Sequence, residues 1–246
     1  MAAMFLKDLG RLDETAEILD VGAGSEEIAF WLACRAARVV AIDIYGEGSF
    51  AYREAADQML RDPASLAPYE YPRDRLEVRS MDARKLAFPD ASFDVVVSFS
   101  SIEHFGTPSD IARSAREIGR VLKPGGHAFI VTEVLVDQHW SDRAPLHFAL
   151  RVASFGRLAP DATTPRLRSI GDQFTRRELR KRIIEPSGLE LMQPLDLSIS
   201  APSFDNVIDM NGPEPRPTTG AEHPHIVLRS HRSCFTSICL PLVKPG

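Results

Sequence analysis

Short β-branched runs alternate with amphipathic stretches along the first half of the chain, and this alternation constrains the fold more than any other feature. The runs predict strands at residues 17–21, 38–42, 76–79, 93–98 and 128–132, and the stretches between them predict helices near 28–37, 50–61 and 107–122. Strands that alternate with helices in this way are typical of a parallel sheet covered by helices. The run at 93–98 is apolar almost throughout, which predicts a central strand buried on both faces.

The helix expected after residue 106 carries sequence signals for its start and its end. Thr107 suits the N-cap, Pro108 suits the first turn, and Asp110 places an acid at the third helical position. The sequence Lys123-Pro124-Gly125-Gly126 predicts that this helix stops and that a tight turn leads into the strand at 128–132.

The second half of the chain has a weaker pattern. After Glu133 the hydrophobic periodicity fades for about forty residues, as in functional lids and caps. Farther on we expect a helix at 175–184, strands at 189–192 and 235–243, and a loop at 211–217. These elements predict one α/β domain over residues 1–246, with a cofactor-binding core at about 14–134 and an irregular cap at about 135–172 and 198–229.

Charge and cysteine content restrict the partners. The chain has 29 Lys and Arg against 34 Asp and Glu, a formal charge of −5, so we expect neither a nucleic-acid partner nor a membrane partner. No apolar run is long enough to span a bilayer or to serve as a secretory signal, which predicts a cytoplasmic protein. Cys34, Cys234 and Cys239 are odd in number and lack a Cys-x-x-Cys spacing, so we expect buried thiols and no metal site.

A glycine-containing turn follows the first predicted strand. Its sequence, Asp20-Val21-Gly22-Ala23-Gly24, lies where a parallel sheet opens a crevice at the carboxyl ends of its strands. Asp43 ends the second strand 21 residues after Gly22, the position of a ribose-binding acid in nucleotide-binding βαβ units. Glu26 and Glu27 at the start of the next helix would repel a pyrophosphate, although they would also stabilise the helix dipole without any ligand.

Five segments in order resemble class I S-adenosylmethionine-dependent methyltransferases, in particular the small type 11, ubiquinone-biosynthesis-like branch. They are Ile18 to Gly24, Val40 to Asp43, Met81-Asp82-Ala83, Phe93 to Ser98, and Glu117 to Gly126, so the resemblance covers residues 18–132. It implies a Rossmann-like, seven-stranded, mostly parallel sheet with helices on both faces. It also implies S-adenosylmethionine as cofactor and S-adenosylhomocysteine as product.

The resemblance assigns cofactor-binding roles to ten residues. It implies that the methionine part of the cofactor is held by Asp20, Gly22, Ala23 and Gly24 and lined by Ser98 and Phe99. It implies that Asp43, followed by Ile44, accepts hydrogen bonds from the ribose hydroxyls. It also implies that Asp82 and Ala83 face the adenine. One departure stands out, because Glu26 occupies the place of the family's usual third glycine.

Two sets of residues are candidate catalytic groups. His104 corresponds to the histidine of the family's Glu-His pair beside the active site, and a histidine suits a general base that takes the proton of an attacking hydroxyl. It could instead only pack on the cofactor. His139 and Asp137 are rivals that could form a base and the group that orients it, line the acceptor pocket, or be ordinary loop residues.

These observations predict methyl transfer to a hydroxyl of a small metabolite or sugar. The fourth strand runs into Ser98-Phe99-Ser100-Ser101 and lacks the Asn-Pro-Pro-aromatic sequence with which amino-methylating nucleic-acid enzymes hold a base, so a small-molecule acceptor is favoured. Two alternatives stay open: a non-catalytic protein that binds either form of the cofactor, and an NAD-type oxidoreductase on a related scaffold. The sequence indicates no oligomeric state.

Overall fold

The chain forms two compact units. The computed structural model describes residues 6, 10, 12–48, 50–51, 54–138, 149, 152–155, 173–205, 207–210, 216–217, 226–230 and 232–246. The first unit comprises residues 1–132, 180–195 and 239–246, and the second comprises 133–179 and 196–238. Whether residues 1–246 act as one domain stays a prediction.

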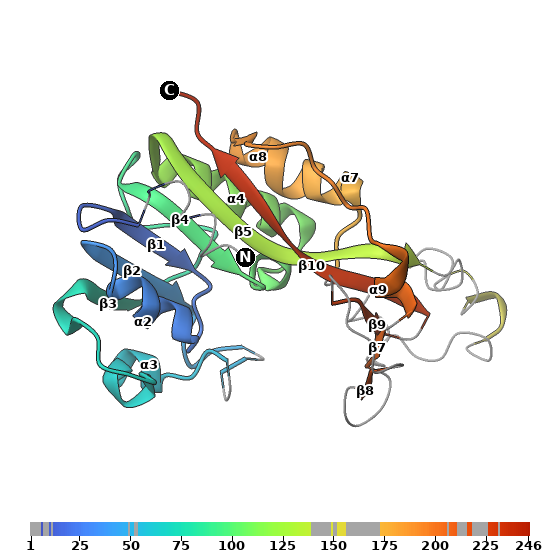
Figure 1. Ribbon diagram of the computed structural model, residues 1–246, viewed down its shortest axis with the longest axis horizontal. Helices are drawn as coiled ribbons and strands as arrows, with labels where there is room; N and C mark the ends of the chain where they lie inside the picture. Colours follow the sequence, from blue (N-terminus) through green and yellow to red (C-terminus); the bar gives the residue numbers. More distant parts are fainter. Residues whose placement is uncertain are drawn as a thin grey trace. The chain divides into compact units, whose positions relative to one another are not determined.

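The first unit contains the expected parallel sheet (Figure 1). Its strands are β1 (Glu17–Val21), β2 (Arg38–Asp43), β3 (Leu76–Ser80), β4 (Phe93–Phe99), the first part of β5 (Leu122–Gln138), β6 (Glu190–Leu191) and the last part of β10 (Ser233–Val243). The strand order is β3-β2-β1-β4-β5-β10, and β6 pairs antiparallel with β10. Because β3, β2, β1, β4 and β5 are parallel neighbours, the described part of this unit has the mostly parallel, seven-stranded sheet predicted from the sequence.

The strand order reverses between β1 and β4. After β1 the chain builds β2 and then β3 on one side, and it then crosses to β4 and β5 on the other side. Asp20 near the end of β1 pairs with Val97 near the end of β4. Connections leave the sheet in opposite directions at such a point, which opens a crevice at the carboxyl ends of the strands.

Helices cover both faces of this sheet, as Figure 1 shows for α2 and α4. The helices of the first unit are α2 (Glu27–Ala33), α3 (Gln58–Arg61), the 3-10 turns η1 (Pro63–Leu66), η2 (Arg73–Arg75) and η3 (Ile102–His104), α4 (Pro108–Val121), the π-helical η5 (Arg180–Ile184) and α8 (Glu185–Ser187). Leu32 and Ala33 of α2 pack into one buried cluster with Ile18, Val95 and Val97 of the sheet. The strand positions that the sequence marks as apolar therefore form the core.

Helix α4 begins as predicted but ends differently. The Thr107 hydroxyl accepts a hydrogen bond from the Asp110 amide, and the Asp110 carboxylate accepts one from the Thr107 amide, which completes a capping box. Leu122 already belongs to β5, where Phe93 pairs with Leu122 and Val95 with His127. The four residues from Lys123 to Gly126 therefore form an irregularity inside β5 rather than a turn before it.

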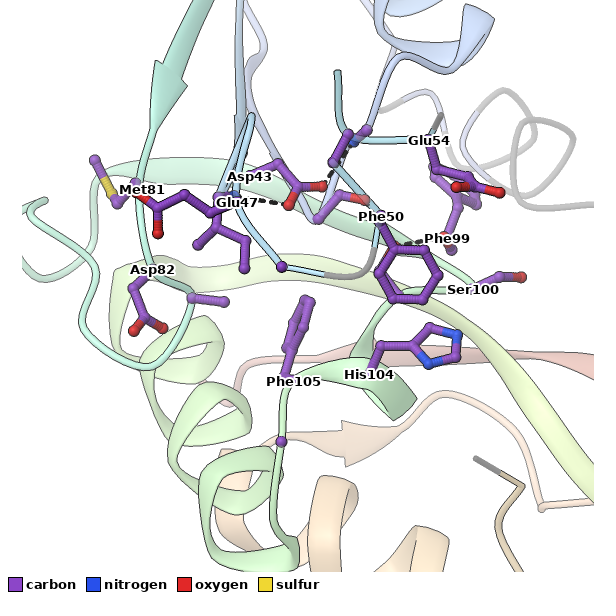
Figure 2. Close-up of a pocket in the computed structure, with 18 of the residues that line it drawn as sticks. Asp43, Glu47, Phe50, Glu54, Met81, Asp82, Phe99, Ser100, His104 and Phe105 are labelled. Carbon is purple, nitrogen blue, oxygen red and sulfur yellow. Dashed lines mark hydrogen bonds between the residues drawn. The ribbon is translucent and has the colours of Figure 1, made fainter. Parts of the chain in front are cut away.

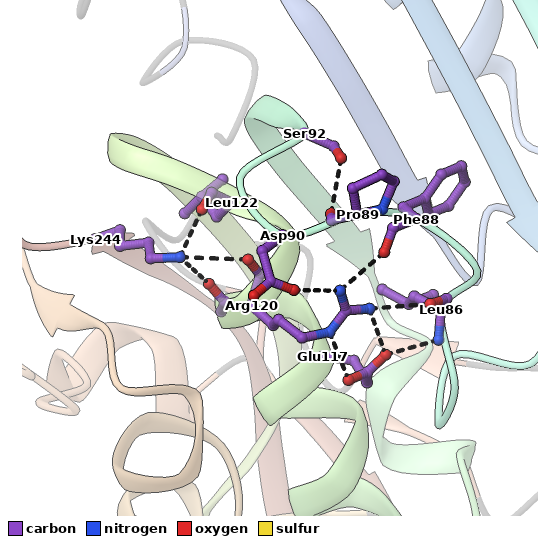
Figure 3. Close-up of polar contacts among 10 residues, drawn as sticks. Leu86, Phe88, Pro89, Asp90, Ser92, Glu117, Arg120, Leu122 and Lys244 are labelled. Atoms are coloured by element: carbon purple, nitrogen blue, oxygen red, sulfur yellow. Dashed lines mark hydrogen bonds and ion pairs between the residues drawn. The ribbon is translucent and has the colours of Figure 1, made fainter.

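A polar cluster ties the end of α4 to two distant segments (Figure 3). Arg120 donates hydrogen bonds to the Glu117 carboxylate, to the Asp90 carboxylate, and to two backbone carbonyls between β3 and β4. Lys244, just after β10, donates at 2.8 Å to the Gly119 carbonyl and at 2.7 Å to the Leu122 carbonyl. The lysine satisfies carbonyl groups that a helix end leaves without partners.

The predicted helix at 50–61 is largely wrong. Of that range only Gln58–Arg61 is helical. Residues 44–57, which we call the β2–α3 loop, instead form turns where the structure describes them, with Gly46 at φ +75° and Gly48 at φ +74°. The helix predicted at 28–37 is also shorter, because α2 ends at Ala33. In both segments local helical patterns yield to tertiary contacts.

The second unit contains short strands around a small core. Its elements are the end of β5, α7 (Arg176–Leu179), α9 (Ala201–Asp205), β7 (Ile208–Asp209), β8 (Arg216–Pro217), β9 (Leu228–Ser230) and the start of β10. β9 pairs with β10, β7 with β9, and β8 with β7, and Val207, Val227 and Cys234 form a buried cluster. The loop predicted at 211–217 is therefore wrong at Arg216–Pro217.

Much of the predicted cap lies outside the described residues. Where the structure describes it, β5 extends to Gln138 and three short strands follow within 198–230, so these parts are less irregular than predicted. The helix predicted at 175–184 is confirmed as α7, η5 and α8, and Gly188 ends it at φ +68°.

Candidate functional site

The pocket of interest lies at the carboxyl ends of the parallel strands of the first unit. It has a volume of about 550 Å³, within the usual range for small-molecule sites. Its walls come from the turn after β1, the β2–α3 loop, the turn after β3, and the segment from β4 through η3. Figure 2 shows Met81 and Asp82 at one end and Phe50, His104 and Ser100 at the other. The pocket therefore lies at the reversal in strand order, where this type of sheet opens its crevice.

The turn after β1 is packed too tightly for side chains at two positions. Gly22 has φ +71°, and a Cβ there would lie 2.5 Å from the Ser101 Cβ. Gly24 has φ +53°, and a Cβ there would lie 2.6 Å from the Glu54 carbonyl oxygen. Both backbone conformations favour glycine. The turn can therefore approach both β4 and the β2–α3 loop closely.

Glu26 does not disturb this turn. It is the N-cap of α2, with φ −75° and ψ 147°, a conformation that any residue adopts readily. The absence of a third glycine therefore causes no backbone strain. The Glu26 side chain instead adds a carboxylate to the pocket lining.

Asp43 joins the turn to the end of β2. One of its carboxylate oxygens accepts a hydrogen bond from the Gly24 amide at 2.9 Å, and the other accepts one from the Ile44 amide at 2.7 Å. Burial raises the pKa of this carboxyl group, while the two amides act in the opposite direction. A carboxylate oxygen can accept more than one hydrogen bond, so Asp43 keeps acceptor capacity toward the pocket.

Asp20 has a different environment. It is fully buried, and neither carboxyl oxygen has a hydrogen-bond partner among the described residues. Burial, followed by repulsion from Asp43 and Glu26, raises its pKa from 3.8 to about 8. Asp20 is therefore protonated at neutral pH. It lies behind the pocket wall rather than in the lining.

Asp82 is already engaged by its neighbour. Both of its oxygens accept hydrogen bonds from Arg84, at distances from 2.7 to 2.9 Å, and this pairing lowers the pKa of Asp82. Three N–H groups of Arg84 make these contacts and occupy much of the acceptor capacity of the carboxylate. A ligand amino group would therefore compete with Arg84 for this carboxylate.

His104 and Phe50 form an aromatic pair at the other end of the pocket. Their ring centroids are 4.9 Å apart and the ring planes meet at 52° (Figure 2). Next to His104 in the sequence, the buried Glu103 carboxylate accepts a hydrogen bond from the Thr132 hydroxyl at 2.8 Å, which links η3 to β5. Ser100 begins this segment with φ +46°, an uncommon conformation for a residue other than glycine, and such backbone strain is concentrated at functional sites.

The pocket brings together most of the residues that the sequence nominates. Eight of them line it: Gly22, Gly24, Asp43, Ile44, Asp82, Ala83, Phe99 and His104. Asp20, Ala23 and Ser98 are buried and do not line it. Asp137 belongs to the second unit, and His139 lies outside the described residues. The roles of all these residues stay predictions.

Sequence reasoning missed the contribution of the β2–α3 loop. Glu47, Phe50 and Glu54 of this loop line the pocket, as does Phe105 after η3. The sequence predicts a helix over part of this loop, and a helix there would not place these side chains in the pocket. The two glycines that begin the loop, at positions 46 and 48, were the available signal for a turn.

The fold and the position of the pocket define a class I, Rossmann-like methyltransferase fold. The crystal structure of an S-adenosylmethionine-dependent methyltransferase from Methanosarcina mazei superposes on the chain with a TM-score of 0.53, over 97% of each chain, at 22% identity. At that identity the likeness establishes the fold alone.

Sequence comparison adds the family. Residues 19–130 match the family described as methyltransferase domain. The ubiquinone biosynthesis O-methyltransferase of Leptothrix cholodnii is 31% identical over 125 residues, which are 50% of this chain and 46% of that relative. The phosphatidylethanolamine N-methyltransferase of Cereibacter sphaeroides is 31% identical over 130 residues, which are 52% of this chain and 54% of that relative. Residues 19–130 are therefore similar to a methyltransferase domain and to S-adenosylmethionine-dependent methyltransferases, a family whose cofactor is S-adenosylmethionine and whose product is S-adenosylhomocysteine.

The chain spans 35–54% of the length of the curated relatives it matches. Across the described residues, every helix falls short of the length and apolar character that crossing a bilayer requires.

The pocket fits the cofactor of this family chemically. Asp43 offers acceptor oxygens to a pair of ribose hydroxyls, and the close-packed turn at Gly22 and Gly24 exposes backbone to a ligand. Carboxylates line the pocket, which suits a cofactor with cationic groups.

Proposed function

We propose that the protein transfers a methyl group from S-adenosylmethionine to a hydroxyl group of a small metabolite or sugar. The observation that carries this proposal is the placement of Asp43, the glycine turn and His104 around one pocket at the reversal in strand order. The cofactor supplies an electrophilic methyl group when bound. In this proposal the chain binds the cofactor, aligns the acceptor and takes up the acceptor's proton.

Each group has a distinct task in this proposal. Asp43 accepts hydrogen bonds from the ribose hydroxyls, and its own bonds to Gly24 and Ile44 hold the carboxylate in place before binding. Ile44 and Ala83 provide apolar contacts for the adenine. His104 takes the proton of the acceptor hydroxyl with its imidazole, which Phe50 packs against.

The choice of oxygen as the methylated atom rests on His104. A hydroxyl group is a weak nucleophile until its proton is removed, whereas an uncharged amine attacks without such help. A histidine at the end of the pocket opposite Met81 and Asp82 is therefore more useful for an oxygen acceptor (Figure 2). The two relatives described above carry different acceptor atoms in their names, so they favour neither.

Cofactor binding is the first test of the proposal. Calorimetry should detect S-adenosylhomocysteine binding with a dissociation constant in the micromolar range, and no comparable binding of NAD. Glu26 and Glu27 lie at the start of α2, where a pyrophosphate would need a free helix N-terminus. Binding of NAD in the absence of any heat from S-adenosylhomocysteine would overturn the proposal.

Turnover is the second test. Tritium transfer from methyl-labelled S-adenosylmethionine to a panel of hydroxylated small molecules separates an enzyme from a protein that only binds the cofactor. Specific transfer that disappears in an Asp43→Ala variant would support the enzyme. Cofactor binding with no transfer to any acceptor, oxygen or nitrogen, would favour the non-catalytic alternative.

A further inference from the structure

The end of the pocket formed by Phe50 and His104 differs in chemistry from the end formed by Met81 and Asp82. In the proposed function the adenine lies at the Met81 and Asp82 end, so the opposite end is left for the methionine part and the acceptor (Figure 2). The aromatic pair of Phe50 and His104 lies there, and Phe50 keeps 37% of its surface exposed. An exposed aromatic ring beside a pocket offers a flat apolar surface to a ligand.

Charge along the lining has one predominant sign. Three lining carboxylates, those of Glu26, Glu47 and Glu54, form no ion pair with any described residue. Arg84 is the one arginine or lysine among the described lining residues, and its guanidinium is already paired with Asp82. In the part of the chain that the structure describes, an anionic acceptor would therefore meet several like charges and no arginine or lysine free of a partner.

Glu54 lines the pocket near its Phe50 end. Its backbone carbonyl accepts a hydrogen bond from the Ser25 amide at 2.6 Å, which fixes this part of the β2–α3 loop against the glycine turn. Its side chain lies on the same side of the pocket as Phe50 in Figure 2. The loop therefore brings a carboxylate on an anchored backbone and an aromatic ring to the same side of the pocket.

We propose that Phe50 and Glu54 are specificity-determining residues that select an acceptor with an apolar ring and without negative charge. Phe50 packs against the ring of the acceptor and holds it beside His104, and Glu54 repels carboxylate or phosphate groups on the acceptor. This proposal rests on the proposed function and adds the class of acceptor. It also places acceptor selection on the β2–α3 loop of the first unit.

Three phenols of similar shape test the proposal: methyl 4-hydroxybenzoate, which is neutral, 4-hydroxybenzoate, which is anionic, and tyramine, which is cationic. Their affinities are measured by ligand-observed NMR in the presence of saturating S-adenosylhomocysteine. The neutral and cationic phenols should bind at least about 8-fold more tightly than the anionic one, because three lining carboxylates with no ion-pair partner among the described residues would each contribute a factor of about 2–5. Equal affinities, tighter binding of the anionic phenol, or no binding of any phenol at millimolar concentration would overturn the proposal.

Variants separate the two residues. Glu54→Gln should reduce the ratio of the affinities for the neutral and the anionic phenol by about 2–5-fold, and Glu54→Lys should reduce this ratio further. Glu70→Lys makes the same change at an exposed position outside the pocket and should leave the preference unchanged. Phe50→Leu should weaken binding of the neutral phenol by about 2–10-fold and raise KM for an accepted substrate more than it lowers kcat. A charge preference that Glu54→Lys leaves intact would overturn the role of Glu54.

The affinity for S-adenosylhomocysteine, measured on the same samples, distinguishes the two proposals. Normal binding of S-adenosylhomocysteine without discrimination among the phenols refutes only the acceptor class. If the unmodified protein does not bind S-adenosylhomocysteine at all, the proposed function itself is refuted.

Discussion

Replacing Asp20 by Asn should stabilise the protein more at pH 8 than at pH 5, relative to the unmodified chain. The Asp20 carboxyl group is fully buried without a hydrogen-bond partner among the described residues, and its pKa is raised to about 8, mainly by burial. In the unfolded chain the group has its ordinary pKa of 3.8. Between these values the folded protein holds a proton that the unfolded chain has lost, so the free energy of unfolding falls as pH rises from about 4 to about 8.

The size of the effect follows from the two pKa values. A difference of about 4 units, at about 1.4 kcal/mol per unit, gives an upper limit of about 6 kcal/mol. Relaxation around the buried ion reduces this cost. We therefore expect the free energy of unfolding of the variant, relative to that of the unmodified chain, to be about 2–4 kcal/mol higher at pH 8 than at pH 5. Comparing the same pair at two pH values cancels the constant cost of burying an amide in place of a neutral carboxyl group.

Urea unfolding followed by circular dichroism at pH 5 and pH 8 measures this gain. Asp74→Asn changes an exposed aspartate in η2 and serves as the control, for which we expect a difference of no more than a few tenths of a kcal/mol. If the Asp20→Asn variant and the unmodified chain lose stability in parallel from pH 5 to pH 8, Asp20 does not hold a proton in the folded state. Calorimetry with S-adenosylhomocysteine on the same variant tests the predicted cofactor role of Asp20 separately.

Three further changes test other parts of the structure. Asp43→Ala should weaken S-adenosylhomocysteine binding by about 2–4 kcal/mol in calorimetry. The same substitution should lower the free energy of unfolding by about 1–2 kcal/mol, because the Asp43 carboxylate also accepts a hydrogen bond from the Gly24 amide. His104→Ala should lower the rate of methyl transfer by about 10²–10⁴-fold with little change in cofactor affinity if His104 is the base, whereas a loss of affinity would indicate that it only packs on the cofactor. Lys244→Met should cost about 1–3 kcal/mol in urea unfolding, since it leaves the Gly119 and Leu122 carbonyls without this donor; an unchanged midpoint would show that water replaces the lysine fully.

The strands of the parallel sheet were predictable because their sequences leave few alternatives. Strand β4 is buried on both faces, so its sequence is a short and nearly continuous run of apolar residues. The cap of α4 was predictable for a similar reason, because Thr107 and Asp110 form their contacts within one turn of the chain. Local sequence determines these features, and tertiary contacts then agree with them.

The β2–α3 loop could not be predicted in the same way. Its conformation depends on distant contacts, such as the hydrogen bond from the Ser25 amide to the Glu54 carbonyl and the packing of Phe50 on His104. Neither contact leaves a periodic pattern in the sequence, and the alanines of the loop favour a helix in isolation. Candidate site residues at the ends of strands were therefore identified, while those on the loop were missed.

Three strands that lead into the pocket carry an aspartate at or just beyond their carboxyl ends, and the structure gives these aspartates three different environments. Asp20 is buried and protonated at neutral pH, and Asp82 has much of its acceptor capacity occupied by Arg84. Asp43 alone of the three combines fixed backbone contacts with oxygens that retain acceptor capacity toward the pocket. A sequence pattern of acids after strands cannot distinguish these environments, because burial and pairing depend on residues far along the chain. The structure therefore makes Asp43 the aspartate on which cofactor binding should depend most strongly.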